Sequence, residues 1–213
     1  MMEERELALL SGTYIQGMHS QRGFTLIEAL IAFVILSVGL LGIVSLQAVA
    51  KSSQQLALQH TRAVTIADAI VERIRVNPAG MATYNTGTGS PVGVTATSEP
   101  SPDCRTAACD SDELAAHDLW AWEQALLGAG AQLNGTNTAG LIEPRGCIVF
   151  TAAPPRANTG QLTVIIQWRG LKESYDAVQS GEVACGGEDA GDDDFRRQVV
   201  ATTFVVDEGE FEL

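Results

Sequence analysis

The sequence lacks the motifs that indicate the common catalytic sites. It contains no HExxH, no GxSxG, no glycine-rich phosphate loop and no histidine beside a candidate nucleophile, so it offers no support for the enzyme classes that these motifs mark. It is also poor in histidine, with only the scattered His19, His60 and His117, and it contains no CxxC. Structural zinc sites draw four ligands from closely spaced cysteines and histidines. We therefore expect no enzyme activity, no cofactor and no metal site.

Basic residues are few as well. Thirteen Lys and Arg stand against 26 Asp and Glu, and the formal net charge is −13. Loss of residues 1–23 would remove two arginines and three glutamates and leave −12. Nucleic-acid binding depends on Lys and Arg that neutralise phosphates. The charge balance therefore argues against nucleic acid as a partner.

One long segment has neither charge nor proline. Residues 29–46 read ALIAFVILSVGLLGIVSL, and with Leu26 and Ile27 they reach the roughly 20 apolar residues that span a hydrocarbon core. A secretory signal peptide has a shorter apolar core, of roughly 7–15 residues. The AVA at 48–50 could serve as a signal-peptidase site, but the length of the run and the acid before it favour a retained membrane helix.

That acid is Glu28, and the residues alone leave its role open. A charged side chain at mid-membrane costs about 2.5 kcal/mol or more, so a glutamate here requires an explanation. It could lie among the headgroups, stabilised by its place in the first turn of a helix. It could equally be a functional group that acquires a partner.

The stretch RGFTLIEAL at 22–30 resembles the class III signal of type IV pilins and pseudopilins. The resemblance implies that a prepilin peptidase cuts after Gly23 and methylates Phe24. It also implies that Glu28 recognises the N-terminal amine of a neighbouring subunit during assembly. A cation beside a carboxylate in low dielectric offsets the cost of burying both. The helix would anchor the chain as a single pass in the inner membrane and later pack in a filament core.

The segment before the cleavage site departs from the family pattern. Leaders of this family are often short and basic, whereas MMEERELALLSGTYIQG at 1–17 is acidic and partly apolar. A start at Met18 would leave the six-residue leader MHSQRG. The family's helix often carries a proline, and none is present here, so local melting on assembly stays open, with Gly39 and Gly42 as weak points.

Beyond Lys51 the helical pattern becomes amphipathic. Apolar residues recur at helical spacings at Leu56, Ala63, Ala67, Ile70 and Ile74. Gln59 falls with the polar residues assigned to the other faces. Asn77–Pro78 should end the helix, because a residue before proline disfavours helical geometry. We expect a leader at 1–23, a membrane or filament-core half at 24–50, an amphipathic half at 51–77 and a globular domain at 78–213.

Two further segments precede the predicted strands. Residues 79–103 are rich in Gly, Thr, Ser and Pro without an apolar period, which predicts a long surface loop. Asp110 and Glu113 predict a capping box that opens a second helix, and Gly128 should close it. Its apolar face is expected to hold Leu114, Leu119, Trp122, Leu126 and Leu127. The block at 109–126 is similar to PilV-type minor pilins.

The C-terminal third is rich in β-branched and aromatic residues. Strands are predicted at 147–151, 162–169 and 198–206. Alternation at 162, 164, 166 and 168 gives one apolar face that could lie on the long helix. The fold class is therefore α+β, a long N-terminal helix packed on a small antiparallel sheet with a second short helix. The pilin resemblance implies the ladle form of this class.

The four cysteines all follow the apolar run, and three pairings are open. Disulfides in an oxidising compartment are expected. We favour Cys104–Cys109, which have four residues between them, together with Cys147–Cys185, which would tie the acidic loop at 188–194 to the sheet. That loop is expected to be solvated, with calcium coordination by Asp192, Asp193 and Asp194 as a minor alternative.

The resemblance implies a minor pilin of the type IV pilus. Such a protein would join other minor pilins in a priming complex at the tip and contact the major pilin and the inner-membrane assembly machinery. Its domain would lie first in the periplasm and then on the pilus at the cell surface, supporting adhesion and twitching motility. A pseudopilin of a type II secretion system and a tip adhesin or other binding module are the alternatives.

Overall fold

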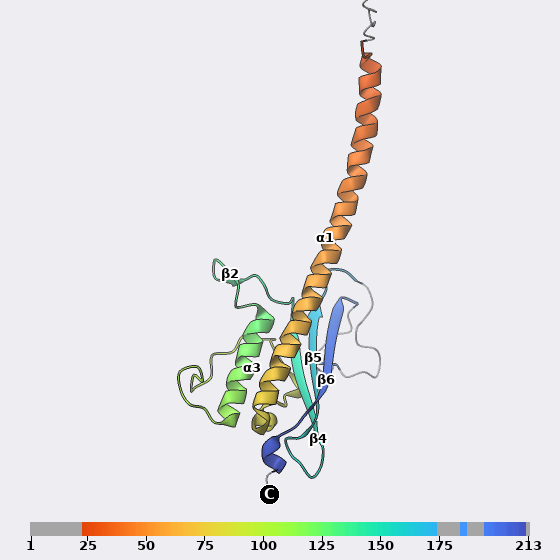
Figure 1. Cartoon of the computed structure of the whole chain (residues 1–213). Coiled ribbons are helices and arrows are strands. Elements are labelled where there is room, and N and C mark those ends of the chain that lie inside the picture. The colour runs from red at the N-terminus through yellow and green to blue at the C-terminus, as the bar shows by residue number, and fades with distance from the viewer. Residues whose placement is uncertain (1–22, 174–183, 187–193, 212–213) are drawn as a thin grey trace, which may run out of the picture. The chain divides into compact units, whose positions relative to one another are not determined.

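The computed structural model describes residues 23–173, 184–186 and 194–211. The chain divides into two compact units, Met1–Ala48 and Val49–Leu213. The helix α1, Leu26–Val76, crosses the boundary between them (Figure 1). It ends one residue before Asn77, as the proline at 78 predicts.

The first unit consists, in its described part, of the apolar half of α1 and the three residues before it. Every large apolar side chain there is exposed, from 53% at Leu40 and Ile43 to 80% at Leu26. Among the described residues, α1 is the one helix long and apolar enough to cross a membrane.

In the second unit α1 contributes one buried face. Its buried residues are Gln59, Ala63, Ala67, Ile70, Val71 and Ile74. The predicted face is confirmed from Ala63 onward, whereas Leu56 is only half-buried. The prediction for Gln59 was wrong, because it lies four residues before Ala63 and so shares the buried face, where it is 2% exposed.

The second unit is built on a four-stranded antiparallel sheet. Its order is β1-β4-β5-β6, formed by Gly87–Val92, Arg145–Ala152, Gly160–Arg169 and Arg196–Val205. Cys147 on β4 pairs with Ile165 on β5, which pairs with Val200 on β6. A separate hairpin joins β2, Gln132–Leu133, to β3, Thr136–Asn137. The three predicted strands and the α+β class are confirmed.

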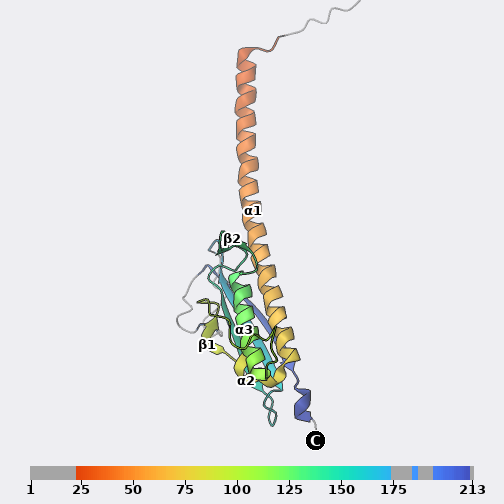
Figure 2. The same cartoon turned by 90° about the vertical axis from the view of Figure 1, so that its left-hand side faces the viewer.

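The main core lies between one face of this sheet and two helices. Leu162, Val164, Ile166 and Trp168 alternate along β5 and are at most 3% exposed, and they belong to one cluster with the buried face of α1. The helix α3, Ser111–Leu127, lies beside this part of α1 in both views (Figures 1 and 2), and Trp122 Nε1 donates to Ile66 O at 3.2 Å. Trp122 fits against β4 because Gly146 has no side chain: a Cβ there would lie 2.4 Å from the indole ring.

The prediction of one long loop at 79–103 was wrong in its first half. The chain instead forms a short turn η1 at Pro78–Gly80, a single helical turn α2 at Met81–Tyr84, and then β1 (Figure 2). Met81 and Tyr84 are at most 1% exposed. β1 has the sequence GTGSPV, and an irregular register with β4 holds it in the sheet, so its strand conformation depends on the pairing with β4 rather than on the strand propensity of its own residues.

The ends of α3 agree with the sequence. Asp110 Oδ1 accepts from Glu113 N, and Glu113 Oε2 accepts from Asp110 N, which is the predicted capping box. Gly128 closes the helix at a φ of 73°. The apolar face differs from the prediction: Leu114, Leu119 and Leu127 are half-buried, while Asp118 and Glu123 are buried. Beyond β6, a last turn η3 spans Glu208–Phe211.

Candidate functional site

The first turn of α1 is organised by a threonine cap. Thr25 O accepts from Glu28 N at 3.1 Å and from Ala29 N at 3.2 Å, and Thr25 Oγ1 lies 3.4 Å from Glu28 N. A threonine followed three residues later by glutamate is the usual opening of a helix. The helix thus starts at Leu26, and Gly23 and Phe24 precede it.

The residues of the predicted processing site are open to solvent. A Cβ placed on Gly23 would meet nothing within 4 Å, and Phe24 is 79% exposed. Of the leader, residues 1–22, including Met18 and Arg22, lie outside the described residues. Both residues of the predicted scissile bond are therefore accessible to solvent.

Glu28 lies one turn along from Phe24 on the exposed surface of α1. Its carboxylate makes no hydrogen bond or ion pair within the described residues. The partial positive charge of a helix N-terminus stabilises a carboxylate in the first turn, but that effect is modest beside the cost of placing the charge in lipid. Glu28 thus presents an exposed carboxylate that makes no ion pair among the described residues.

The four cysteines form two disulfides. Cys104 is bonded to Cys109 in the loop before α3, and Cys147 of β4 is bonded to Cys185. This is the pairing favoured from the sequence. Cys147 and Cys185 are fully buried with Ile165, in a small cluster separate from the main core. The acidic loop is described only at Asp194, so the suggested calcium ligands Asp192 and Asp193 lie outside the described residues.

A buried carboxylate joins three helical elements of the second unit. Asp118 on α3 accepts from Tyr84 Oη at 2.6 Å and from Arg73 Nη1 of α1 at 2.7 Å. Burial, and then the hydrogen bond to Asp118, raise the pKa of Tyr84 well above its usual range. The sequence does not reveal this network, because nothing local marks Asp118 as inward-facing.

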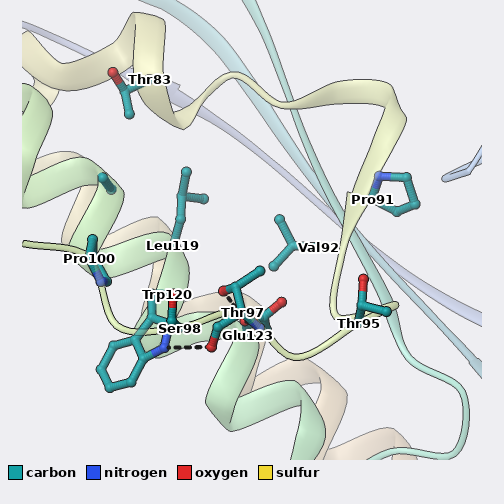
Figure 3. A pocket seen from close by; sticks show the side chains of 11 residues that line it. Thr83, Pro91, Val92, Thr95, Thr97, Ser98, Pro100, Leu119, Trp120 and Glu123 are labelled. Carbon is teal, nitrogen blue, oxygen red and sulfur yellow. Dashed lines mark hydrogen bonds between the residues drawn. The ribbon is translucent and has the colours of Figure 1, made fainter.

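An open hollow of about 360 Å³ lies between α3 and the chain that follows β1. Figure 3 shows Leu119, Trp120 and Glu123 of α3 facing the segment that carries Val92 and Thr97. Glu123 Oε2 accepts from the backbone N–H of Thr97 at 2.8 Å and also from its hydroxyl, while Trp120 Nε1 donates to Thr97 O at 3.3 Å. The buried Glu123 carboxylate thus holds this segment against α3 through hydrogen bonds.

Two family models match adjoining parts of the chain. The prokaryotic N-terminal methylation motif matches residues 18–44, and the family described as type IV pilin Tt1218 matches residues 45–120. The first match contains Gly23, Phe24 and Glu28, and the second contains the amphipathic half of α1 and most of α3. No curated protein and no solved structure gives a significant match.

Proposed function

The chain is a type IV pilin-like protein, and from this premise we propose that it is a minor pilin of the type IV pilus. The methylation motif implies processing by a prepilin peptidase and assembly of a pilin type, and the apolar helix suggests membrane anchoring. The observation that carries the proposal is Glu28 in the first turn, which is exposed, lies one turn from Phe24 and makes no ion pair among the described residues.

The proposed processing removes residues 1–23. The peptidase cuts the Gly23–Phe24 bond and methylates the new amine of Phe24, and the accessibility of both residues supports this step. The methylation-motif match begins at residue 18, which accords with MHSQRG as the working leader. Residues 24–50 then anchor the chain in the inner membrane, with 51–77 and the globular domain at 78–213 in the periplasm.

Assembly follows from the charge that the processed chain presents. The Phe24 amine of one subunit is a cation, and Glu28 of its neighbour is an exposed carboxylate with no ion pair in the described part of the chain. In the low dielectric of lipid or a filament core, pairing them offsets the cost of burying either alone. Each subunit supplies one group of each kind, so the contact repeats along a filament.

The minor role rests on the domain beyond the helix. The block at 109–126 resembles the corresponding part of PilV-type minor pilins, and the domain is held by two disulfides suited to an oxidising compartment. In this role the chain joins other minor pilins in a priming complex at the tip, contacts the major pilin and the inner-membrane assembly machinery, and promotes adhesion and twitching motility through assembly. A type II secretion pseudopilin is the second candidate, because the same N-terminal turn serves both.

Two measurements test the proposal. Mass spectrometry of the mature protein should find methylated Phe24 at the N-terminus; any other terminus removes its foundation. Glu28→Ala should leave membrane insertion unchanged but abolish incorporation into sheared filaments, while Glu72→Ala, an exposed acid on the other half of α1, should incorporate normally.

Deletion of the gene separates the assembly role from the alternatives. The minor-pilin role predicts few surface pili and, as a consequence, poor adhesion and twitching. Abundant pili with lost adhesion would favour a tip adhesin, and normal pili with lost protein secretion would favour the pseudopilin.

A further inference from the structure

A histidine and two carboxylates converge where the loop before α3 crosses that helix. Glu99 and Asp103 come from the loop and His117 from α3, and one possible ligand atom from each lies within 4.8 Å of the others. His117 Nε2 is 3.6 Å from Glu99 Oε1 and 3.6 Å from Asp103 Oδ1. Residues 18 positions apart in sequence thus meet at one point of the second unit.

The histidine nitrogen at this point is buried without a partner. His117 is 7% exposed, and its Nε2 makes no hydrogen bond within the described residues. A buried polar atom left unpaired is destabilising, and such an atom in a native structure can mark the place of an ion or a water. The nitrogen faces two oxygens at equal distance rather than bonding to one of them.

The spacing matches the coordination shell of a small divalent metal. Zinc binds histidine nitrogen and carboxylate oxygen at about 2.0–2.2 Å with tetrahedral geometry, which places neighbouring ligand atoms about 3.4 Å apart. The two nitrogen–oxygen separations here are 3.6 Å. One imidazole with two carboxylates suits zinc better than calcium or magnesium, which prefer all-oxygen sites.

We propose that Glu99, Asp103 and His117 form a zinc site that fastens the loop carrying the Cys104–Cys109 disulfide to α3. Three protein ligands leave the fourth position for water. The ion would neutralise the two acids and satisfy the buried nitrogen at once. The proposal concerns the globular unit alone and stands independently of the assembly role.

Arg105 pairs with the same two carboxylates. Its Nε donates to Asp103 Oδ1 at 2.9 Å, and its Nη2 pairs with Glu99 Oε1. The Arg105 side chain is 60% exposed, with its guanidinium 5.9 Å above the Trp120 ring. An exposed ion pair of this kind is weak, so a metal that binds both oxygens and the histidine can displace the arginine into solvent. The arginine is thus a competitor of the metal.

A purely structural charge cluster is the rival interpretation. A protonated His117 would form ion pairs with the same two oxygens and need no metal. The two interpretations differ in the effect of removing Arg105. A metal site gains affinity when its competitor is lost, whereas a charge cluster simply loses one of its cations.

The test is zinc titration of the full mature chain in detergent, by calorimetry with zinc chloride and by the visible absorption of cobalt(II) as a stand-in for zinc. We expect one ion per chain. Asp103→Asn, a change at the loop surface that the fold should tolerate, and His117→Gln should each weaken binding at least about tenfold, the loss that even an outer-shell partner of a metal ligand brings. Arg105→Gln should tighten it roughly three- to tenfold, because the broken ion pairs are individually weak.

His60→Gln is the matched control, since His60 is an exposed histidine on α1 and its loss should leave binding unchanged. Circular dichroism of each variant confirms folding. The proposal is overturned if no stoichiometric zinc binds at micromolar concentration, if folded Asp103→Asn binds as the parent does, or if Arg105→Gln fails to tighten binding.

Discussion

The two halves of α1 share one backbone but differ in what surrounds them. Between Leu26 and Ala48 no side chain is buried, whereas six are buried between Val49 and Val76. Helical hydrogen bonds are the same in both halves, but helices in proteins gain most of their stability from packing of an apolar face. The second half obtains that packing from its own domain, and the first must obtain it from outside the chain.

The exposed apolar surface of the first half indicates what that outside is. Soluble monomers rarely expose contiguous apolar patches larger than a few hundred Å², and here an apolar surface surrounds the helix for the length of a membrane span. Lipid and the equivalent helices of other subunits are both apolar surroundings of this kind. α1 is therefore one continuous helix with two separate sources of stability.

The largest expected effect comes from comparing the same substitution, isoleucine to alanine, in the two halves of α1. Ile70 is fully buried and Ile35 is 68% exposed. Ile70→Ala should lower the free energy of unfolding of the globular unit by about 2–5 kcal/mol, since it leaves a cavity in a packed core. Ile35→Ala should change it by less than about 0.5 kcal/mol. Urea denaturation in detergent measures both, and equal losses would show that the halves are not independent.

A second effect tests how the buried half of α1 is fastened to its domain. Asp118→Asn removes the negative charge that accepts hydrogen bonds from Arg73 and Tyr84. It should lower the free energy of unfolding by about 1–3 kcal/mol, because buried polar groups lose their partner. The loss falls short of that for a fully buried ion pair, since the Arg73 side chain is 46% exposed and can find water. Denaturation of Asp118→Asn beside Asp112→Asn, an exposed acid of the same helix, checks this.

The sequence predicted those parts of the fold that local chemistry determines. The stop at Val76 follows from a proline, the ends of α3 from a capping box and a glycine, and β5 from a run rich in apolar and β-branched residues. It did not predict β1, because GTGSPV has no strand pattern and is recruited by pairing with β4. Nor did it predict the burial of Gln59, because polarity was weighed above its position on the helix.

The two candidate sites also differ in whether the local sequence marks them. Gly23, Phe24 and Glu28 lie within six residues, and the spacing itself is the signal. Glu99, Asp103 and His117 belong to a loop and a helix that meet only through tertiary structure. The sequence showed three scattered histidines and hence no metal site. Only the fold shows which of them faces two acids.

Tyr84 gives a pH-dependent effect confined to the second unit. Its pKa is raised in the folded state by burial and by the bond to Asp118, so the folded chain retains a proton that the unfolded chain releases above about pH 10. The contribution of Tyr84 to the free energy of unfolding is therefore complete below about pH 10. Above about pH 10 the free energy of unfolding falls by about 1.4 kcal/mol per pH unit for this one group. Denaturation midpoints from pH 9 to 11 should show a slope that Tyr84→Phe reduces; an unchanged slope would contradict the assignment.

The smallest effect probes the first half alone. A Cβ added to Gly42 would meet nothing within 4 Å of its own chain, and alanine is favoured over glycine inside a helix by about 0.5–1 kcal/mol. Gly42→Ala should therefore slow amide hydrogen exchange of the surrounding turns in detergent by a factor of about two to five. It should leave the unfolding of the globular unit unchanged.

Gly146→Ala is the opposite case, because its Cβ would clash with Trp122. It should destabilise the globular unit without altering exchange near residue 42. If Gly42→Ala instead shifts the unfolding of the globular unit, the two halves of α1 are coupled and the separation of their stability sources fails.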